Sequence, residues 1–180
     1  MGCGKMKVLK FCDEEVEVMS RGHLIWDEYF MSVANLSSMR SKDPRTKVGA
    51  CIVNENNHIV GVGYNGFPVG ISDDEFPWSK EGDFLETKYP YVVHAEQNAI
   101  LNAHVSVRGC RIYTSSFPCH ECAKYIIQSG VKEVIYMRKN GSDENSQAAS
   151  KKMFDATGII YRKMPMLEIT VRVLEGLEDL

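Results

Sequence analysis

The feature that most constrains the fold of this 180-residue chain is the alternation of strand and helix patterns in its second half. Short apolar runs predict strands at 110–114, 133–137 and 159–161. Helical patterns at 119–129 and 142–157 separate them and end at Gly130 and Gly158, and glycine commonly follows a helix C-terminus. Strands that alternate with single helices predict βαβ crossovers and a mainly parallel sheet covered by helices.

The first half of the chain predicts a helix, a hairpin and a long irregular segment. Apolar residues recur at three- and four-residue steps from Trp26, so we expect a helix that ends near Arg40, before a proline. The runs 48–53 and 58–64 are expected to form two strands joined by turn-forming asparagines. Residues 65–93 contain several glycines and prolines, and such long loops in a domain are usually functional. A helix is expected at about 94–102.

Length and composition indicate one globular domain of ordinary composition, with 44% hydrophobic residues. We expect a flexible tail at 1–23, one domain at 24–164 and an extension of uncertain structure at 165–180. No apolar run approaches the roughly 18 residues of a membrane helix, and the net charge of −3 disfavours a nucleic-acid partner. No signal peptide is visible, so a reducing, cytoplasmic setting is expected, without a disulfide framework.

Two short motifs carry the chemistry: His94-Ala95-Glu96 and Pro118-Cys-His-Glu-Cys122. Cys119 and Cys122 are three residues apart, so their thiols share one face of a first helical turn, where the helix terminus favours thiolates. One histidine and two cysteines suit zinc and leave a fourth position open for water. Glu96 is poorly placed as a ligand but well placed to move protons. The pattern matches the H-x-E…P-C-x-x-C signature of zinc deaminases.

Two other interpretations of the cysteine pair remain open. The pair could be a redox centre, or a structural zinc site with a fourth ligand from His120, His104 or Cys110. The second alternative leaves Glu96 without a role. The remaining cysteines are expected to be two core thiols, Cys51 and Cys110, and two tail thiols, Cys3 and Cys12.

At these motifs the chain resembles the cytidine and deoxycytidylate deaminase superfamily. The resemblance runs from about Trp26 to Arg162. The segments similar to its deoxycytidylate deaminase branch are 41–44 (SKDP), 48–50 (VGA), 63–68 (GYNGFP), 94–100 (HAEQNAI) and 117–124 (FPCHECAK). It implies an α/β fold, a three-layer α/β/α sandwich around a five-stranded mixed sheet whose last two strands are parallel.

The resemblance also implies a function. It implies one zinc ion per subunit on His94, Cys119 and Cys122, with Glu96 as the catalytic proton shuttle. The implied reaction converts dCMP to dUMP and ammonia and supplies thymidylate synthesis. Members are commonly homohexamers that dCTP activates together with Mg²⁺ and that dTTP inhibits. The family's nucleotide regulation is built around the segment 63–66 and the long loop after it, so the expected allosteric residues are Gly63, Tyr64, Asn65 and Gly66.

The expected substrate contacts concern the sugar, the base and the 5′-phosphate. Asn65 aligns with a superfamily asparagine that touches the sugar, and Ala95 is expected beside the substrate. Phe117 is expected to pack either on the base or in the core, and the same two alternatives apply to Tyr64. For the 5′-phosphate the expected residues are Ser41 and Lys42, with Arg40 and Lys47 nearby; the alternative is that this segment is a solvated helix end.

Two departures from some phage members of the family affect these expectations. An asparagine, Asn140, stands near the position of a tyrosine that those members hold close to the substrate. The ligands of their second, structural zinc are also absent, since Asp43 and Pro44 occupy one of its regions. The competing functions are a nucleoside deaminase, a deaminase of tRNA or single-stranded DNA, and a non-catalytic zinc protein that binds nucleotides.

Overall fold

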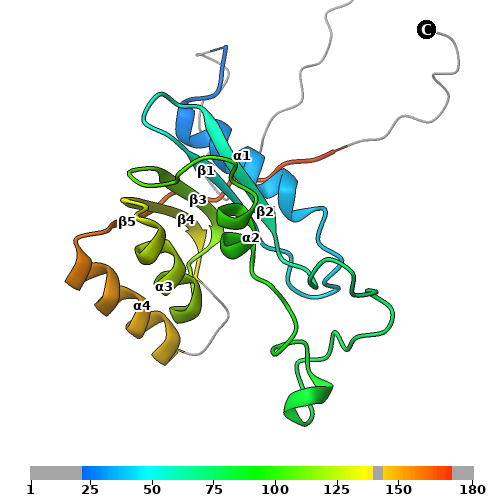
Figure 1. The fold of residues 1–180 in the computed structure, drawn as a ribbon. Coiled ribbons are helices and arrows are strands. Elements are labelled where there is room, and N and C mark those ends of the chain that lie inside the picture. Colours follow the sequence, from blue (N-terminus) through cyan, green and yellow to red (C-terminus); the bar gives the residue numbers. More distant parts are fainter. Residues whose placement is uncertain (1–21, 140–143, 172–180) are drawn as a thin grey trace, which may run out of the picture.

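The computed structural model describes residues 22–139 and 144–171, which form a five-stranded sheet with helices on both faces (Figure 1). The strands are β1 (Gly49–Val53), β2 (Ile59–Tyr64), β3 (Arg111–Ser116), β4 (Glu133–Arg138) and β5 (Ile160–Lys163). The helices are α1 (Trp26–Ser38), α2 (Ala95–Leu101), α3 (His120–Ser129) and α4 (Glu144–Thr157), with a short 3₁₀ helix, η2, at Phe84–Glu86.

The sheet has the order β2-β1-β3-β4-β5 and mixed pairing. β1 is antiparallel to β2 and to β3, whereas β3, β4 and β5 are parallel to one another. The mixed sheet and the parallel last two strands are confirmed. The expectation of a mainly parallel sheet was wrong, because the hairpin of β1 and β2 joins β3 through β1, which makes half of the pairings antiparallel.

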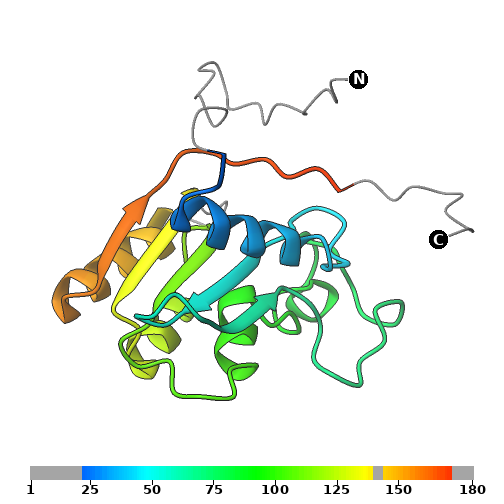
Figure 2. The same cartoon turned by 90° about the horizontal axis from the view of Figure 1, so that it is seen from above.

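Two hydrophobic cores make the fold a three-layer sandwich (Figure 2). Helix α1 packs on one face of the sheet, where Phe30 and Met31 meet Tyr113 of β3. Helices α2, α3 and α4 cover the other face. All five residues of β1 are buried, because its side chains enter both cores in turn. This double burial explains the continuous apolar run that marked the strand in the sequence.

Most expected element boundaries agree with the structure to within two residues. β3 extends to Ser116, and β5 is shifted to Ile160–Lys163. The expected irregular segment 65–93 contains only η2 and an isolated bridge between Gly66 and Val93. The start of the expected helix at 142, Asn140 and the tail up to residue 21 lie outside the described residues. Residues 164–171 are irregular, but Leu167 is buried and its carbonyl accepts a hydrogen bond from Asn35 at 3.0 Å.

Glycines in β1 and β2 allow helix backbones to approach the sheet closely. A Cβ on Gly49 would lie 1.9 Å from the Ala34 carbonyl oxygen of α1. A Cβ on Gly63 would lie 2.3 Å from the Ala95 carbonyl oxygen and from the Ala99 nitrogen of α2. No side chain fits at either position without moving a helix, so Gly63 helps to set the position of the start of α2.

Among the helices of the described residues, none is both long and apolar enough to cross a membrane.

Candidate active site

The starts of helices α2 and α3 bring three potential metal ligands together. His94 is the residue before α2, Cys119 is the residue before α3, and Cys122 lies in the first turn of α3. The His94 Nδ1 atom lies 3.3 Å from the Cys122 Sγ atom and 3.4 Å from the Cys119 Sγ atom. All three ligand atoms lie within 4.8 Å of one another.

The spacing of these atoms fits zinc. With Zn–S bonds of about 2.3 Å and Zn–N bonds of about 2.0–2.1 Å, a tetrahedral ion separates nitrogen and sulfur ligands by about 3.6 Å. The observed nitrogen–sulfur distances are close to that value. In the part of the chain that the structure describes, no fourth His, Cys, Asp or Glu joins the group. His120, one expected alternative ligand, instead contacts the Ser146 hydroxyl at 2.8 Å and the Glu121 carboxylate at 3.2 Å.

The cluster distributes its protons unevenly between the two thiols. A hydrogen bond from the Cys122 thiol lowers the pKa of Cys119 to about 4, and His94 adds to this effect. The same contact, together with burial, raises the pKa of Cys122 well above its usual value. The hydrogen bond with Cys119 raises the pKa of His94. A metal ion therefore meets a thiolate at Cys119 and has to displace the thiol proton of Cys122.

Glu96 lies next to this cluster without being part of it. Its side chain is buried, and its Oε2 atom lies 3.5 Å from the Cys122 Sγ atom. Burial raises the pKa of Glu96 above its ordinary value. A raised pKa moves the titration of this carboxyl group toward neutral pH, the direction that favours general acid–base catalysis.

A cavity of about 930 Å³ opens over the cluster and connects the two helix starts with the long irregular segment. Of the expected substrate residues, Asn65, Ala95 and Phe117 line it, together with His94, Glu96 and Cys119. Phe117 is also part of the hydrophobic core, where its ring packs edge-on against Tyr136 and Phe154. Phe117 is therefore a core residue that also borders the cavity, and its contact with the base stays a prediction.

The residues expected to bind the phosphate, Ser41 and Lys42 with Arg40 and Lys47 nearby, do not line this cavity. Ser41 is buried, and its hydroxyl accepts a hydrogen bond from the Asp43 backbone N–H at 3.3 Å. Lys42 is exposed and forms an ion pair with Asp73 at 2.5 Å. Tyr64, one of the expected regulatory residues, is partly exposed, and its carbonyl accepts a hydrogen bond from Asn98 of α2.

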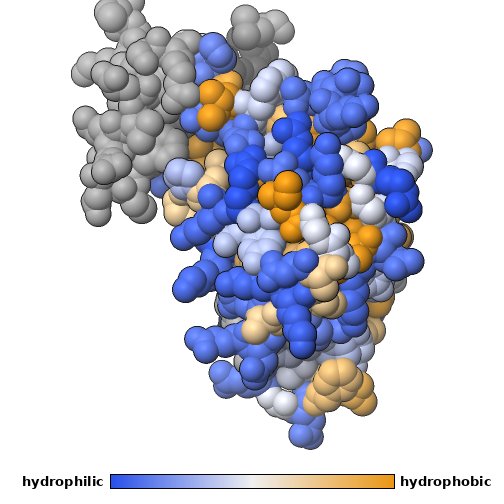
Figure 3. All heavy atoms as spheres, turned by 90° about the vertical axis from the view of Figure 1, so that its left-hand side faces the viewer, coloured by the Kyte–Doolittle hydropathy of each residue, from blue (hydrophilic) through white to orange (hydrophobic). Residues whose placement is uncertain are grey.

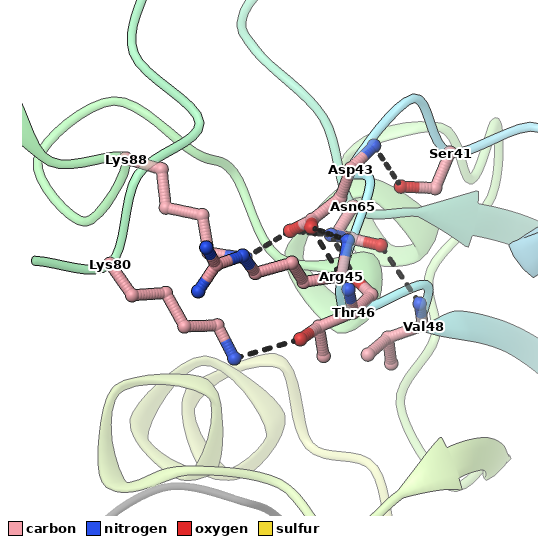
Figure 4. Close-up of polar contacts among 8 residues, drawn as sticks. All are labelled: Ser41, Asp43, Arg45, Thr46, Val48, Asn65, Lys80 and Lys88. Atoms are coloured by element: carbon pink, nitrogen blue, oxygen red, sulfur yellow. Dashed lines mark hydrogen bonds and ion pairs between the residues drawn. The ribbon is translucent and has the colours of Figure 1, made fainter.

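Asn65 holds the chain that precedes β1 (Figure 4). Its Oδ1 atom accepts from the Val48 N–H at 2.8 Å, and its Nδ2 atom donates to the Thr46 carbonyl at 2.9 Å. Nδ2 also lies 3.4 Å from the carboxylate of Asp43, a fully buried residue. The Asn65 side chain therefore supports the cavity wall as well as facing the cavity.

Thr46, Lys80 and Lys88 are among the polar residues of the cavity that the sequence reasoning missed. Lys88 forms an ion pair with Asp43, and the Lys80 ammonium donates to the Thr46 hydroxyl at 3.0 Å. Both lysines belong to the irregular segment 65–93. The length of that segment was the available signal, but no periodicity indicated which of its residues turn toward the site.

Comparisons with known proteins agree with this geometry. Residues 24–138 match the family model described as the cytidine and deoxycytidylate deaminase zinc-binding region. The deoxycytidylate deaminase of Homo sapiens is 54% identical over 143 residues, which cover 78% of this chain and 80% of that protein. A probable deoxycytidylate deaminase of Drosophila melanogaster is 54% identical over 148 residues, covering 78% of this chain and 73% of that protein.

A solved structure shares the fold. The dCMP deaminase of cyanophage S-TIM5, in complex with dCMP and dUMP, superposes with a TM-score of 0.62 and 30% sequence identity. The superposition covers 79% of this chain and all of the phage chain.

Proposed function

Because the chain belongs to the cytidine and deoxycytidylate deaminase family, we propose that it hydrolyses dCMP to dUMP and ammonia. The observation that carries this proposal is a buried carboxyl group, Glu96, beside a His/Cys/Cys cluster at the floor of a cavity. The names of the 54% identical relatives and the nucleotides bound by the phage enzyme support dCMP as the substrate.

We propose that one zinc ion per subunit binds to His94, Cys119 and Cys122. Zinc supplies a Lewis acid that makes water a nucleophile near neutral pH. The protein has to hold the cytosine ring over the cluster, exclude other water and handle the protons. Ala95 and Phe117 are the proposed contacts of the base, and Asn65 is the proposed contact of the sugar, since all three line the cavity.

Glu96 is the proposed proton shuttle. Hydrolysis forms a bond from the water oxygen to C4 of the ring, breaks the bond from C4 to the amino nitrogen and releases ammonia. The Glu96 carboxylate accepts a proton from the attacking water and delivers it to N3 of the ring. It then transfers the second water proton to the departing amino nitrogen. Its burial and raised pKa suit a group that alternates between the two protonation states.

The regulatory proposals concern the end of β2 and the long segment after it. We propose that dCTP with Mg²⁺ activates the protein and that dTTP inhibits it, through residues Gly63 to Gly66, and that its dUMP supplies thymidylate synthesis. The close packing of Gly63 on α2 supports this link, because a shift at the end of β2 would move the helix that carries Glu96.

We also propose that the chain forms a homo-oligomer, and a hexamer in particular. Figure 3 shows hydrophobic side chains gathered near the middle of a largely hydrophilic face on the side of α4 and β5. Exposed apolar residues on these elements and on the adjoining α3 include Tyr125 and Ile160, and Met153 and Ile127 line a groove between α3 and α4. Burial of such a surface favours association.

A substrate panel tests the proposed function. Ultraviolet absorbance follows deamination of dCMP, CMP, deoxycytidine and dCTP by the zinc-loaded protein, each with and without added dCTP or dTTP. We expect dCMP to be preferred and the two effectors to act in opposite directions. Activity on deoxycytidine without any preference for dCMP would overturn the assignment of a nucleotide substrate.

A further inference from the structure

The long segment between β2 and α2 places two lysines at one wall of the cavity. Lys80 and Lys88 both line the cavity that contains Glu96. Figure 4 shows the side chains of both lysines and of Arg45 extending toward the same side of the loop that precedes β1. A mildly acidic chain thus has cationic groups at the cavity of its proposed substrate, and that substrate carries a phosphate.

Asp43 organises this wall. Its Oδ1 atom accepts hydrogen bonds from the backbone N–H groups of Arg45 and Thr46, both at 2.9 Å. Its Oδ2 atom contacts the ammonium of Lys88, whose side chain is 8% exposed, and the Asn65 amide. The Thr46 hydroxyl in turn accepts the hydrogen bond from Lys80. One buried carboxylate therefore fixes the loop 43–48, Lys88 and, through Thr46, the position of Lys80.

The two lysines differ in how their charge is balanced. The carboxylate of Asp43 compensates Lys88, whereas no carboxylate of the described residues lies within ion-pair distance of Lys80. Lys80 thus offers an uncompensated positive charge. The Lys88 ammonium uses one N–H group for Asp43, which fixes its position, and has two further N–H groups to donate. A phosphate dianion requires such a combination of charge and fixed donors.

We propose that Lys80 and Lys88, supported by Thr46, bind the 5′-phosphate of the substrate and so determine the preference for a nucleotide over a nucleoside. This inference rests on the proposed deamination of dCMP. It assigns the phosphate to the lysines of the cavity wall rather than to Ser41 and Lys42. Lys80 and Lys88 lie 34 and 45 residues along the chain from their partners Thr46 and Asp43.

Lys80→Met tests the assignment, because Lys80 is exposed and its loss leaves the Asp43–Lys88 pair in place. We expect kcat/KM for dCMP to fall by about 10- to 100-fold, chiefly through KM, as the loss of a hydrogen bond to a charged group predicts. The slow turnover of deoxycytidine should not change, and Lys80→Arg should restore most of the dCMP activity. The Ki of inorganic phosphate as a competitive inhibitor should rise in parallel with KM.

Lys152→Met is the matched control, since Lys152 is an exposed lysine of α4 outside the cavity. The inference is overturned if Lys80→Met leaves kcat/KM for dCMP unchanged, if it lowers deoxycytidine turnover equally, or if Lys42→Met causes the loss instead. Failure of the proposed function looks different, because the unmodified zinc-loaded protein would then not deaminate dCMP at all.

Discussion

The ion pair between Asp43 and Lys88 offers a direct test of how the cavity wall is held. The side chain of Asp43 is fully buried and that of Lys88 nearly so, and the two residues lie 45 positions apart in the chain. Asp43→Asn and Lys88→Met each remove one charge and keep the approximate shape of the side chain. The double variant removes both charges, which completes a double-mutant cycle.

Breaking a buried pair costs about 3–5 kcal/mol, because the remaining charge is left without its partner. For Lys88→Met we expect the lower end, about 3 kcal/mol, since the Asp43 carboxylate keeps the two backbone N–H groups and the Asn65 amide as donors. Asp43→Asn turns an amide N–H₂ toward either those donors or the ammonium, so it should cost at least as much. The double variant should lose about 3–4 kcal/mol rather than the sum of about 6, because no uncompensated charge remains.

Urea unfolding at pH 7 measures these free energies, and thermal melting should show decreases in Tm of about 6–12 °C for each single variant. Single-variant costs below about 1 kcal/mol, or energies that simply add in the double variant, would refute the reasoning.

The pH dependence gives a second measurement of the same pair. Burial raises the pKa of Asp43, but the hydrogen bonds from Lys88 and two backbone N–H groups outweigh it and leave the pKa below the ordinary value. A carboxyl group whose pKa is lower in the folded state contributes stability above its unfolded pKa of about 3.9. That contribution is lost as the pH falls through the folded-state pKa. The Asp43→Asn variant should therefore lose less stability than the unmodified protein between about pH 5 and pH 2.

Three further predictions concern the metal ligands, the proton shuttle and the packing of α2. Glu96→Gln should keep zinc near one ion per chain by elemental analysis and lower dCMP turnover by at least about 100-fold, whereas near-normal turnover would contradict the shuttle role. Gly63→Ala should cost about 1–3 kcal/mol or more in urea unfolding, because its Cβ would meet the backbone of α2 at 2.3 Å. Gly66→Ala is its stability control, since that Cβ would meet only the Tyr64 side chain at 4.0 Å. Zinc affinity should rise from about pH 6 to about pH 8, because the raised pKa values of Cys122 and His94 mean that zinc binding displaces protons. Competition with a chromogenic chelator measures this affinity. An affinity independent of pH would count against the prediction.

The parts of the fold that follow from local patterns could be predicted from the sequence. The apolar run of β1 and the periodicity of α1 depend on burial of each element alone, so they are readable one element at a time. The proportion of parallel pairing was not predictable in this way, because it depends on which edge of the β1–β2 hairpin meets β3. That choice is made by tertiary packing and leaves no period in the sequence.

The same difference between local pattern and tertiary packing distinguishes the residues at the helix starts from the lysines of the cavity wall. His94 and Glu96 are two positions apart and Cys119 and Cys122 three, so helical geometry alone indicates how each pair is placed. Lys80 and Lys88 reach the cavity from irregular chain through contacts across 34 and 45 residues. No spacing rule connects such residues, so the sequence alone could not indicate that these two lysines line the cavity.

These two groups of residues should also respond differently to substitution. The proposed metal ligands and Glu96 lie at the starts of α2 and α3, and the backbone of α2 packs directly against Gly63 of β2. Lys80 and Lys88 lie on an irregular segment that is joined to the loop before β1 by contacts of the buried Asp43 carboxylate. Sites on regular elements are positioned more precisely than sites on loops. Substitutions in the loops should therefore change KM and the preference for a phosphate, whereas substitutions under α2 should change kcat and zinc retention, even at equal cost in stability.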